Sequence, residues 1–251
     1  MLAMRYKCTV AYVGTAYAGF QSQKNAPTIQ DEIERALAQI FQESIRIIGA
    51  SRTDQGVHAY GQVFHFDAKE MEMWRLQRAL NSLLPKTIRI QNVQKVGKDF
   101  HARFSVLEKT YLYVINTGPY DPFMQDRAYQ RNYPLDYAKM KEVAHLYIGT
   151  HDFGSFNTAP YALYPDQVRC IRECKVIQKG SRYIIEVTGN GFLRHMVRIM
   201  VGTMVDVARG HSTVSEVEEM LRHPTKSKRR YNIDAGGLYL LKICYAKEKA
   251  E

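Results

Sequence analysis

The sequence predicts an α+β fold made of two fused ferredoxin-like (RRM-like) halves, each with the element order βαββαβ. Segments with the two-residue alternation of strands and segments with the helical period follow one another in this order twice along the 251 residues. No stretch of linker composition separates the repeats, and the boundary falls near residues 103–108. We therefore expect residues 1–106 and 107–251 to share an extended antiparallel sheet with its helices on one side.

The first half starts with an alternating strand at residues 6–13 and continues through a turn-rich stretch at 14–27. Thr28 predicts a helix start, because its hydroxyl can cap the first turn while Asp31 reaches back to it. An apolar stripe at helical spacing then runs to Phe41. The other elements expected in this half are strands at 45–50 and 60–67, a helix at about 73–83 and a strand at 88–96.

The second half repeats this order. The elements expected there are a strand at 109–116, a helix at 135–147, a hairpin of 171–178 with 182–188 that turns at Gly180, a helix at 192–208 and a strand at 238–245. Antiparallel sheets of this kind leave one face free of helices, so two of them side by side form a broad concave floor. Such a floor suits a polyanion, and we expect it to form a central binding cleft.

The composition favours a polyanionic partner. The chain carries 35 Lys and Arg against 25 Asp and Glu, which gives a formal net charge of +10 and a sequence pI of about 9.4. This balance favours nucleic acid over an acidic protein or a neutral metabolite, although it does not choose RNA over DNA. The 45% hydrophobic content is that of a globular chain with a buried core, which argues against disorder.

The cysteines indicate a reduced, cytoplasmic protein. Cys8, Cys170, Cys174 and Cys244 lie in strand-like segments without a paired CxxC framework or further ligands at zinc spacing. The N-terminus has no apolar signal region, and no segment approaches the roughly 18 uninterrupted apolar residues of a membrane span. We expect neither a bound metal nor a membrane association.

The residues at 52–59, Arg-Thr-Asp-Gln-Gly-Val-His-Ala, place one carboxylate in a tight turn between two strand-like segments. An Asp near a Gly is most often turn chemistry alone, because the short side chain bonds its own backbone and Gly accepts positive φ. Arg52 lies two residues before Asp54, and aromatic and basic motifs follow downstream. Together they make Asp54 a candidate catalytic acid.

The octapeptide closely resembles the catalytic signature of the tRNA pseudouridine synthase A family, in which the Asp is the essential nucleophile. The resemblance extends through nearly the whole chain, in order and at family-like spacing. Its other motifs are Gly14-Thr15 with Gly19-Phe20-Gln21-Ser22-Gln23, Gly61-Gln62-Val63, Leu80-Asn81-Ser82-Leu83-Leu84-Pro85, Phe100-His101-Ala102-Arg103-Phe104-Ser105, Lys109-Thr110-Tyr111-Leu112-Tyr113, His151-Asp152-Phe153-Gly154-Ser155-Phe156, His195-Met196-Val197-Arg198 with Gly202, and Gly237-Leu238-Tyr239-Leu240.

The resemblance implies an isomerisation of uridine to pseudouridine at positions 38, 39 and 40 of the anticodon stem-loop. The bond from ribose to N1 of uracil breaks, the base turns while bound, and C5 joins the sugar, so no cofactor is expected. Asp54 can begin the reaction at the anomeric carbon, at C6 of the ring or by helping to remove a ribose proton, and the sequence does not choose among these routes.

A carboxylate in a pocket that excludes water needs a nearby cation to stay ionised. Arg198 is the candidate partner, because it lies on a predicted apolar helix where a lone charge is costly. Arg194 lies one turn earlier on the same predicted face. Read without the resemblance, Arg198 is more simply a structural ion pair or a charge at the helix edge.

Tyr111 has an ordinary interpretation as a strand aromatic that packs on a cross-strand neighbour. The resemblance implies instead that its ring stacks on the target uracil and that its hydroxyl bonds or exchanges a proton. Tyr113 shares the Tyr111 face of the strand and is expected to support the site indirectly.

The target uridine must leave its stack before a carboxylate can reach the glycosidic bond. The resemblance implies that Arg52 occupies or holds open the vacated space, whereas a phosphate contact or a surface charge is the simpler interpretation. Leu238 resembles the apolar residue that lines the uracil pocket and otherwise reads as strand core. The predicted substrate-binding residues are therefore Arg52, Tyr111 and Leu238.

A basic run precedes the last strand, with no acid among its members Arg222, Lys226, Lys228, Arg229 and Arg230. Such runs are most often solvated loops, but this one adjoins a predicted pocket residue and could bind the tRNA backbone.

Two places depart from the family pattern, since Phe20 stands where a Trp is usual and residues 231–236 replace a typical Thr-Ala-Pro approach to the last strand. A paralogue with a different or narrower RNA target is therefore an alternative. A noncatalytic RNA-binding or RNA-folding protein is a second, although a pure binder has no use for a carboxylate where a polyanion docks. A nuclease or deaminase would need clustered metal ligands. The resemblance also implies a homodimer whose subunits jointly hold one tRNA.

Overall fold

The computed structural model describes residues 3–226 and 231–246, and its internal contacts divide the chain into two compact units. The first unit comprises Met1–Leu107 with Tyr239–Glu251, and the second comprises Glu108–Leu238. From residue 239 onward the final strand therefore belongs to the first unit, whereas the sequence interpretation placed it in the second half.

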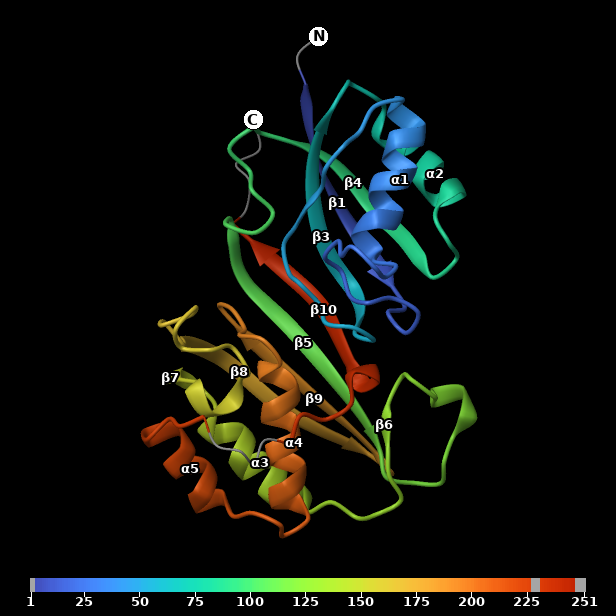
Figure 1. Cartoon of the computed structure of the whole chain (residues 1–251). Coiled ribbons are helices and arrows are strands. Elements are labelled where there is room, and N and C mark those ends of the chain that lie inside the picture. Colours follow the sequence, from blue (N-terminus) through green and yellow to red (C-terminus); the bar gives the residue numbers. More distant parts are fainter. Residues whose placement is uncertain (1–2, 227–230, 247–251) are drawn as a thin grey trace. The chain divides into compact units, whose positions relative to one another are not determined.

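The first unit is built on a sheet with two helices on one side (Figure 1). Its elements are β1 (Met4–Tyr12), α1 (Ile29–Phe41), β2 (Ile48–Gly49), β3 (His58–Ala68), α2 (Met73–Leu83), β4 (Ile88–Val96) and β10 (Leu238–Tyr245). β1 pairs antiparallel with both β3 and β4, and β2 pairs antiparallel with β3. β10 runs parallel to β3, with Tyr239 opposite His58. The strand order is β4-β1-β3-β10.

The core of the first unit lies between this sheet and its helices. The ring of Tyr6 on β1 stacks on that of Phe66 on β3 at 5.4 Å, and Phe41 at the end of α1 meets Phe66 edge-on. Fully buried apolar side chains complete this layer: Cys8, Val10, Phe64, Ile29, Ile33, Leu37, Leu76 and Leu80. The alternation of buried residues along β1 is the pattern that predicted the strand.

The second unit also places its helices against one antiparallel sheet (Figure 1). Its elements are β5 (Val106–Asn116), η1 (Pro122–Met124), β6 (Tyr129–Gln130), α3 (Tyr137–Leu146), β7 (Gly149–Asp152), η2 (Gly154–Phe156), β8 (Val168–Lys179), β9 (Arg182–Gly189), α4 (Met196–Ala208), α5 (Val214–Arg222) and η3 (Ala235–Gly237). The strand order is β5-β9-β8-β7 with antiparallel neighbours, and β6 adds in parallel to β5. α3 packs against α4, α5 and β8.

The turns of the second unit follow the chemistry of their residues. The β8–β9 hairpin turns at Gly180, whose φ of 59° confirms the predicted position. α4 ends in a Schellman motif, because His211 N donates to Asp206 O and Gly210 N donates to Val207 O. Gly210 supplies the positive φ of 76° that this motif needs.

Two predicted boundaries moved for local reasons. Thr28 caps α1 as predicted and accepts from Asp31 N at 3.2 Å. The predicted strand at 45–50 shrinks to β2, because side chains of α1 take both backbone groups of Ile47. α4 begins at Met196 and not at residue 192, since His195 has a φ of 61°, which ends the preceding turn. Arg194 therefore precedes the helix and does not share its face, contrary to the prediction.

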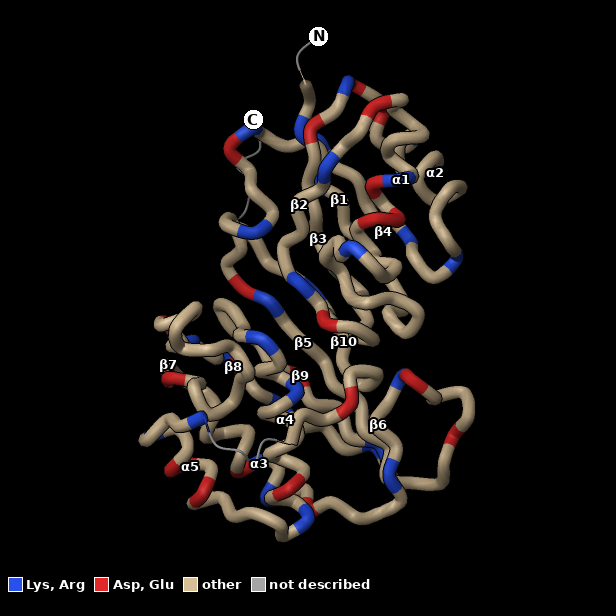
Figure 2. The backbone as a smooth tube through the Cα atoms, in the orientation of Figure 1, with Lys and Arg blue, Asp and Glu red and all other residues tan. Residues whose placement is uncertain are grey.

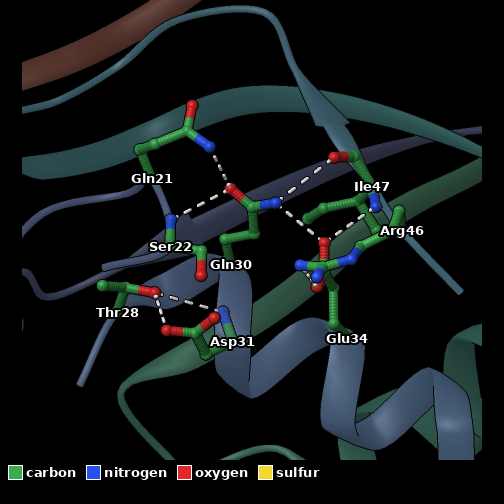
Figure 3. A network of polar contacts seen from close by, with 8 residues as sticks. All are labelled: Gln21, Ser22, Thr28, Gln30, Asp31, Glu34, Arg46 and Ile47. Atoms are coloured by element: carbon green, nitrogen blue, oxygen red, sulfur yellow. Dashed lines mark hydrogen bonds and ion pairs between the residues drawn. The ribbon is translucent and has the colours of Figure 1, made fainter. Parts of the chain in front are cut away.

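The side chains that capture Ile47 belong to a polar network between α1 and its flanking loops (Figure 3). Gln30 Oε1 accepts from Gln21 Nε2 at 2.9 Å and from Ser22 N at 3.1 Å. Gln30 Nε2 donates to Glu34 Oε1 at 2.7 Å, and the same oxygen accepts from Ile47 N at 3.0 Å. The buried Gln30 amide thus ties the loop before α1 to the loop after it.

A buried histidine ties the segment after β4 to the sheet. His65 on β3 is 3% exposed, and its Nδ1 accepts from Ala102 N at 3.1 Å. Burial, and then the positive charges of Arg5 and His101, lower the pKa of His65 from about 6.5 to about 4, and the nearby Asp67 opposes this only weakly. His65 is therefore neutral at pH 7, as its acceptor role requires.

No helix in the described ranges is long and apolar enough to span a membrane.

The His65 contact predicts a pH dependence of stability. The folded pKa lies below the unfolded one, so the unfolded state binds more protons and the contribution is lost as the pH falls from about 6.5 toward about 4. Between pH 7 and pH 5 we expect a loss of about 1–2 kcal/mol from this group, measured by urea unfolding. His65→Gln keeps an acceptor but does not titrate, so it should reduce this loss. An equal pH dependence in both proteins would contradict the assignment.

Candidate active site

The loop that carries Asp54 connects β2 to β3 and is held by hydrogen bonds at both ends. At its start, the buried Gln62 side chain accepts from Ser51 N at 3.2 Å and donates to Ser51 O at 2.7 Å. At its end, Val57 N donates to Asp54 O at 3.2 Å and closes the turn. Gly56 adopts the positive φ of 79° that this turn needs. The backbone on both sides of the carboxylate is therefore fixed.

Two glycines of the preceding segment lie directly against this loop. A Cβ on Gly19, whose φ is 107°, would lie 2.6 Å from Thr53 O, and a Cβ on Gly14 would lie 2.0 Å from Val57 O. Phe20 N donates to Thr53 O at 3.1 Å. This close backbone contact explains the Gly14 and Gly19 positions of the sequence motif, because no other residue fits there.

Phe20 lies in the core behind the loop and not at its surface. Its side chain is 1% exposed, and a Cβ on Gly49 would lie 2.3 Å from its Cε1. Its ring is 6.2 Å from that of Tyr12, whose hydroxyl bonds the Thr53 hydroxyl at 2.7 Å. The departure from the usual Trp therefore concerns the support of the loop and not a substrate contact.

The loop exposes its functional side chains selectively. Ser51 and Thr53 are buried, Arg52 between them is exposed, and Asp54 is half-buried. The structure thus places Arg52 and Asp54 on one rigid loop of the first unit, with Arg52 in solvent and the carboxylate partly sheltered.

The other predicted site residues belong to the second unit. Tyr111 lies on β5 opposite Val187 of β9 and is 6% exposed. Its ring meets Phe192 edge-on at 5.1 Å. Phe192 belongs to the segment before α4, so β5 contacts that segment through Tyr111.

Arg198 on α4 donates from Nε to Ile233 O at 2.7 Å. Tyr113, two residues after Tyr111 and on the same side of β5, donates its hydroxyl to Asp234 O at 2.7 Å. Burial, and then the Asp234 carboxylate, raise the pKa of Tyr113, while the positive charge of Arg198 opposes this. Tyr113 is therefore a neutral donor, and two side chains hold consecutive carbonyls of one segment.

This segment, residues 231–237, leads directly into Leu238. The Tyr231 hydroxyl bonds that of Tyr129 at the edge of the sheet. A Cβ on Gly237 would lie 2.7 Å from Cζ of Tyr113, so the backbone there packs on the tyrosine ring. Leu238 is 5% exposed and begins β10. Tyr113 and Arg198 together thus fix the backbone that leads to Leu238.

The basic run is partly engaged within the protein. Arg222 pairs with Glu218 at 2.6 Å. The Lys226 ammonium donates to Asn157 Oδ1 at 2.9 Å and to Gln167 Oε1 at 2.7 Å, and it lies 4.7 Å from the ring centroid of Tyr161. Lys228, Arg229 and Arg230 lie outside the described residues. Figure 2 shows basic and acidic residues along the backbone of both units.

The structure groups the predicted residues by unit. Arg52 and Asp54 share the loop of the first unit. In the second unit, Arg198 on α4 binds the 231–238 segment, which ends at Leu238, and Tyr111 lies on β5. Among the described residues, no group of three or more His, Cys, Asp and Glu side chains is placed to hold a metal ion. The four cysteines are free.

Sequence reasoning missed several residues that support the site. Gln62 and Gly14 were visible as motif members, but nothing in the pattern showed that they clamp the Asp54 loop. His58, the seventh residue of the octapeptide, accepts from Gly14 N at 3.0 Å and stacks on Tyr239 at 4.7 Å. The role of Asp234 rests on its carbonyl oxygen, which every residue has, so no sequence signal marks it.

Comparison with known proteins decides what this arrangement belongs to. The family model described as tRNA pseudouridine synthase matches residues 9–105 and 143–246, which include Asp54 and Arg198. The chain belongs to the tRNA pseudouridine synthase family. The matched stretches include the Asp54 loop and its two clamping glycines in the first unit, and α4 with the 231–238 segment in the second.

Individual relatives in the tRNA pseudouridine synthase family match the chain from end to end. It is 42% identical over 246 residues to a tRNA pseudouridine synthase A of an Exiguobacterium species, covering 97% of this chain and 98% of that protein. It is 41% identical over 245 residues to that of Anoxybacillus flavithermus, at 96% and 98% coverage, and 40% identical to that of Brevibacillus brevis, at 96% and 99%.

The contact between Gly19 and Thr53 predicts that Gly19→Ala displaces the Asp54 loop. Positive φ and the overlap with a backbone oxygen together should lower the free energy of unfolding by about 2–4 kcal/mol, and activity should fall at a temperature where the variant stays folded. Gly210→Ala is the matched control, because Gly210 also has positive φ but nothing lies within 4 Å of its added Cβ. The control should lose about 1 kcal/mol and keep activity; equal behaviour of both variants would be inconsistent with the clamp.

The bond from Tyr113 to Asp234 O predicts a selective effect of Tyr113→Phe. Tyr183→Phe is the control, since Tyr183 is a buried tyrosine of the same unit whose hydroxyl donates to Leu135 O and accepts from Gln178 Nε2, both at 3.1 Å. Each variant should lose about 1–2 kcal/mol of stability in urea unfolding. Only Tyr113→Phe should also change kcat or KM, because the Tyr113 bond, unlike the Tyr183 bond, holds the segment leading to Leu238. Unchanged kinetics in Tyr113→Phe would remove Tyr113 from the positioning role.

Proposed function

We propose that this protein isomerises uridine to pseudouridine in the anticodon stem-loop of tRNA, at positions 38, 39 and 40, with Asp54 as the nucleophile. The observation that carries the proposal is the family match over both units together with the rigid loop that presents Asp54. Relatives of about 40% identity over their whole length bear the name tRNA pseudouridine synthase A. Every residue proposed here for the reaction lies in the matched stretches, except Tyr111.

The reaction needs little beyond one carboxylate and a pocket. The bond from C1′ of ribose to N1 of uracil breaks, a bond from C1′ to C5 forms, the proton on C5 leaves, and N1 gains a proton. Atoms and electrons balance within the nucleotide, so neither an oxidant nor a group donor is consumed. The carboxylate of Asp54 can act at C1′, at C6 or on a ribose proton, and all three routes remain open.

We propose Arg198 as the cationic partner of Asp54 and Tyr111 as the ring that stacks on the uracil. Arg198 uses Nε on Ile233 O, which fixes the plane and direction of its guanidinium. Tyr111 is buried against Phe192, which supports the orientation of its ring. Leu238 lines the uracil pocket in this proposal, and the exposed Arg52 assists extrusion of the base.

The finer features of the fold are part of the same proposal. In the first unit the β4-β1-β3 order with β2 beside β3 and alternating helices supports a ferredoxin-like half, and β5-β9-β8 supports a second. We infer a homodimer that holds one tRNA, by likeness to the family. A cytoplasmic location follows from the proposed substrate, and the four free cysteines agree with it.

The alternative substrate choice rests on the two sequence departures. Phe20 supports the Asp54 loop from the core, and residues 231–236 approach the proposed uracil pocket. A paralogue with a narrower target would therefore owe its different choice of substrate to residues 231–236 and not to Phe20. A noncatalytic RNA-binding protein is the less favoured alternative, because a binder has no use for a carboxylate on a fixed loop where a polyanion would dock.

Asp54→Asn tests the function directly. The amide keeps the shape of the side chain but cannot act as a nucleophile, so binding of an unmodified tRNA transcript should persist while pseudouridine formation falls by at least about 10³-fold. The experiment incubates wild-type and variant protein with tRNA transcripts without added cofactors and maps pseudouridine by position.

Asp31→Asn is a control that removes one half-buried carboxylate, which accepts from the Thr28 hydroxyl at the α1 cap. It should leave turnover within about twofold, since Asp31 lies outside the site. Product from Asp54→Asn at the wild-type rate would exclude Asp54 as the nucleophile. Product at positions other than 38, 39 and 40 would favour the paralogue, and binding without any product from the wild-type protein would favour the noncatalytic alternative.

A further inference from the structure

The segment Phe100–Ser105 is a sequence motif to which no role has been assigned, and the structure holds it unusually firmly. Ala102 N donates to His65 Nδ1 at 3.1 Å, and the Ala102 carbonyl accepts from the Tyr245 hydroxyl at 2.8 Å. The next two amides, of Arg103 and Phe104, both donate to His101 Nδ1 at 3.2 Å. The segment is therefore a rigid platform attached to β3 and β10.

The platform presents an aromatic ring to solvent. Phe104 is 80% exposed, although a phenylalanine that serves only packing is normally buried. Its ring stacks on that of His101 at 4.3 Å between centroids and 25° between planes. His101 thus supports the Phe104 ring, and its 80% exposure leaves area on which an additional flat ring can stack.

Two arginines lie in the segments that meet at this platform. Ala50 packs with Phe100 and Ala102 in one buried cluster, which brings the start of the Asp54 loop alongside the platform. Arg52 lies two residues after Ala50, and Arg103 directly follows Ala102. Burial, and then the positive charge of Arg52, lower the pKa of Arg103, so the two cations repel each other. An anion near both would relieve this repulsion.

We propose that Arg103 and Phe104 form a subsite for the nucleotide next to the extruded uridine, with the guanidinium on its phosphate and the ring stacked on its base. This inference rests on the proposed function, because it needs a single-stranded nucleotide beside the target. Arg52 adds its charge to the attraction for that phosphate. Two extended residues span at most about 7 Å, so the backbone of Arg52 lies close to that of Asp54 on the same loop, and a neighbour of the target nucleotide is the natural occupant.

The pairing of a stacking ring with a cation is the chemistry by which proteins hold unpaired nucleotides without reading their sequence. Base identity is not selected by a phenylalanine ring, since every base offers a flat face. The subsite therefore fits an enzyme that must accept different neighbours beside its target. It also supplies binding energy away from the reacting bond, which should appear in KM and not in kcat.

The test compares Phe104→Ala, Phe104→Trp and Arg103→Gln with two matched controls. Phe123→Ala removes an 87% exposed phenylalanine of the second unit, and Arg35→Gln removes an exposed arginine paired with Glu32. Each substitution is measured for kcat and KM on an unmodified tRNA transcript. Each is also placed in the Asp54→Asn background to measure tRNA affinity at several salt concentrations, without turnover. Thermal unfolding confirms that each variant is folded.

We expect Phe104→Ala to raise KM and the dissociation constant about tenfold with kcat within about twofold, and Phe104→Trp to restore both. Arg103→Gln should reduce the slope of log affinity against log salt by about one, since one phosphate contact is lost. The two controls should match the wild type.

The outcomes separate the subsite from the function. If Phe104→Ala and Arg103→Gln behave like Phe123→Ala and Arg35→Gln while the wild type forms pseudouridine, the subsite is refuted and the function stands. If the wild type forms no pseudouridine, the function fails, and the affinity measurements still decide whether Phe104 and Arg103 bind tRNA. A fall in kcat alone would also refute the subsite, because a binding contact acts through KM.

Discussion

The close contact between the backbone at Gly14 and Gly19 and the Asp54 loop is the constraint on which the first unit depends. At both places the separation leaves no room for a Cβ, so the loop has one position relative to the end of β1. Hydrogen bonds from Phe20 N and from Gln62 then determine its direction. The sheet pairing of β1 with β3 brings these segments together. A carboxylate on such a backbone needs few side-chain partners to stay in place.

The second unit reaches a comparable result by a different route, since side chains there hold a backbone segment through its carbonyls. Arg198 and Tyr113 bind Ile233 O and Asp234 O, and every residue type supplies such an oxygen. The side chains at 231–236 can therefore change without loss of these bonds. This accounts for a segment that departs from the family sequence while still being anchored. Gly237 is an exception, because the ring of Tyr113 occupies the space a side chain would need.

Much of the fold could be predicted because periodicity is a local signal. Most strands and helices appeared close to their predicted bounds, including the Thr28 cap and the turn at Gly180. β7 and α5 were missed, although α5 carries a capping box of Thr213 and Glu216 that the sequence displays. The shortening of β2 could not be predicted, since it depends on side chains of α1.

The candidate site, like the fold, could be predicted only where its residues are close together in the sequence. The octapeptide identified the Asp54 loop, because its residues adjoin in the chain. The bond from Tyr113 to Asp234 joins residues 121 positions apart and leaves no pattern. Basic residues lie along both units and affect the encounter with RNA. A surplus of +10 with charges in both units acts as a diffuse field that speeds collision with a polyanion but weakens beyond about 8 Å at physiological ionic strength. Capture is then fast and unselective, and the correct register must come from contacts made after arrival.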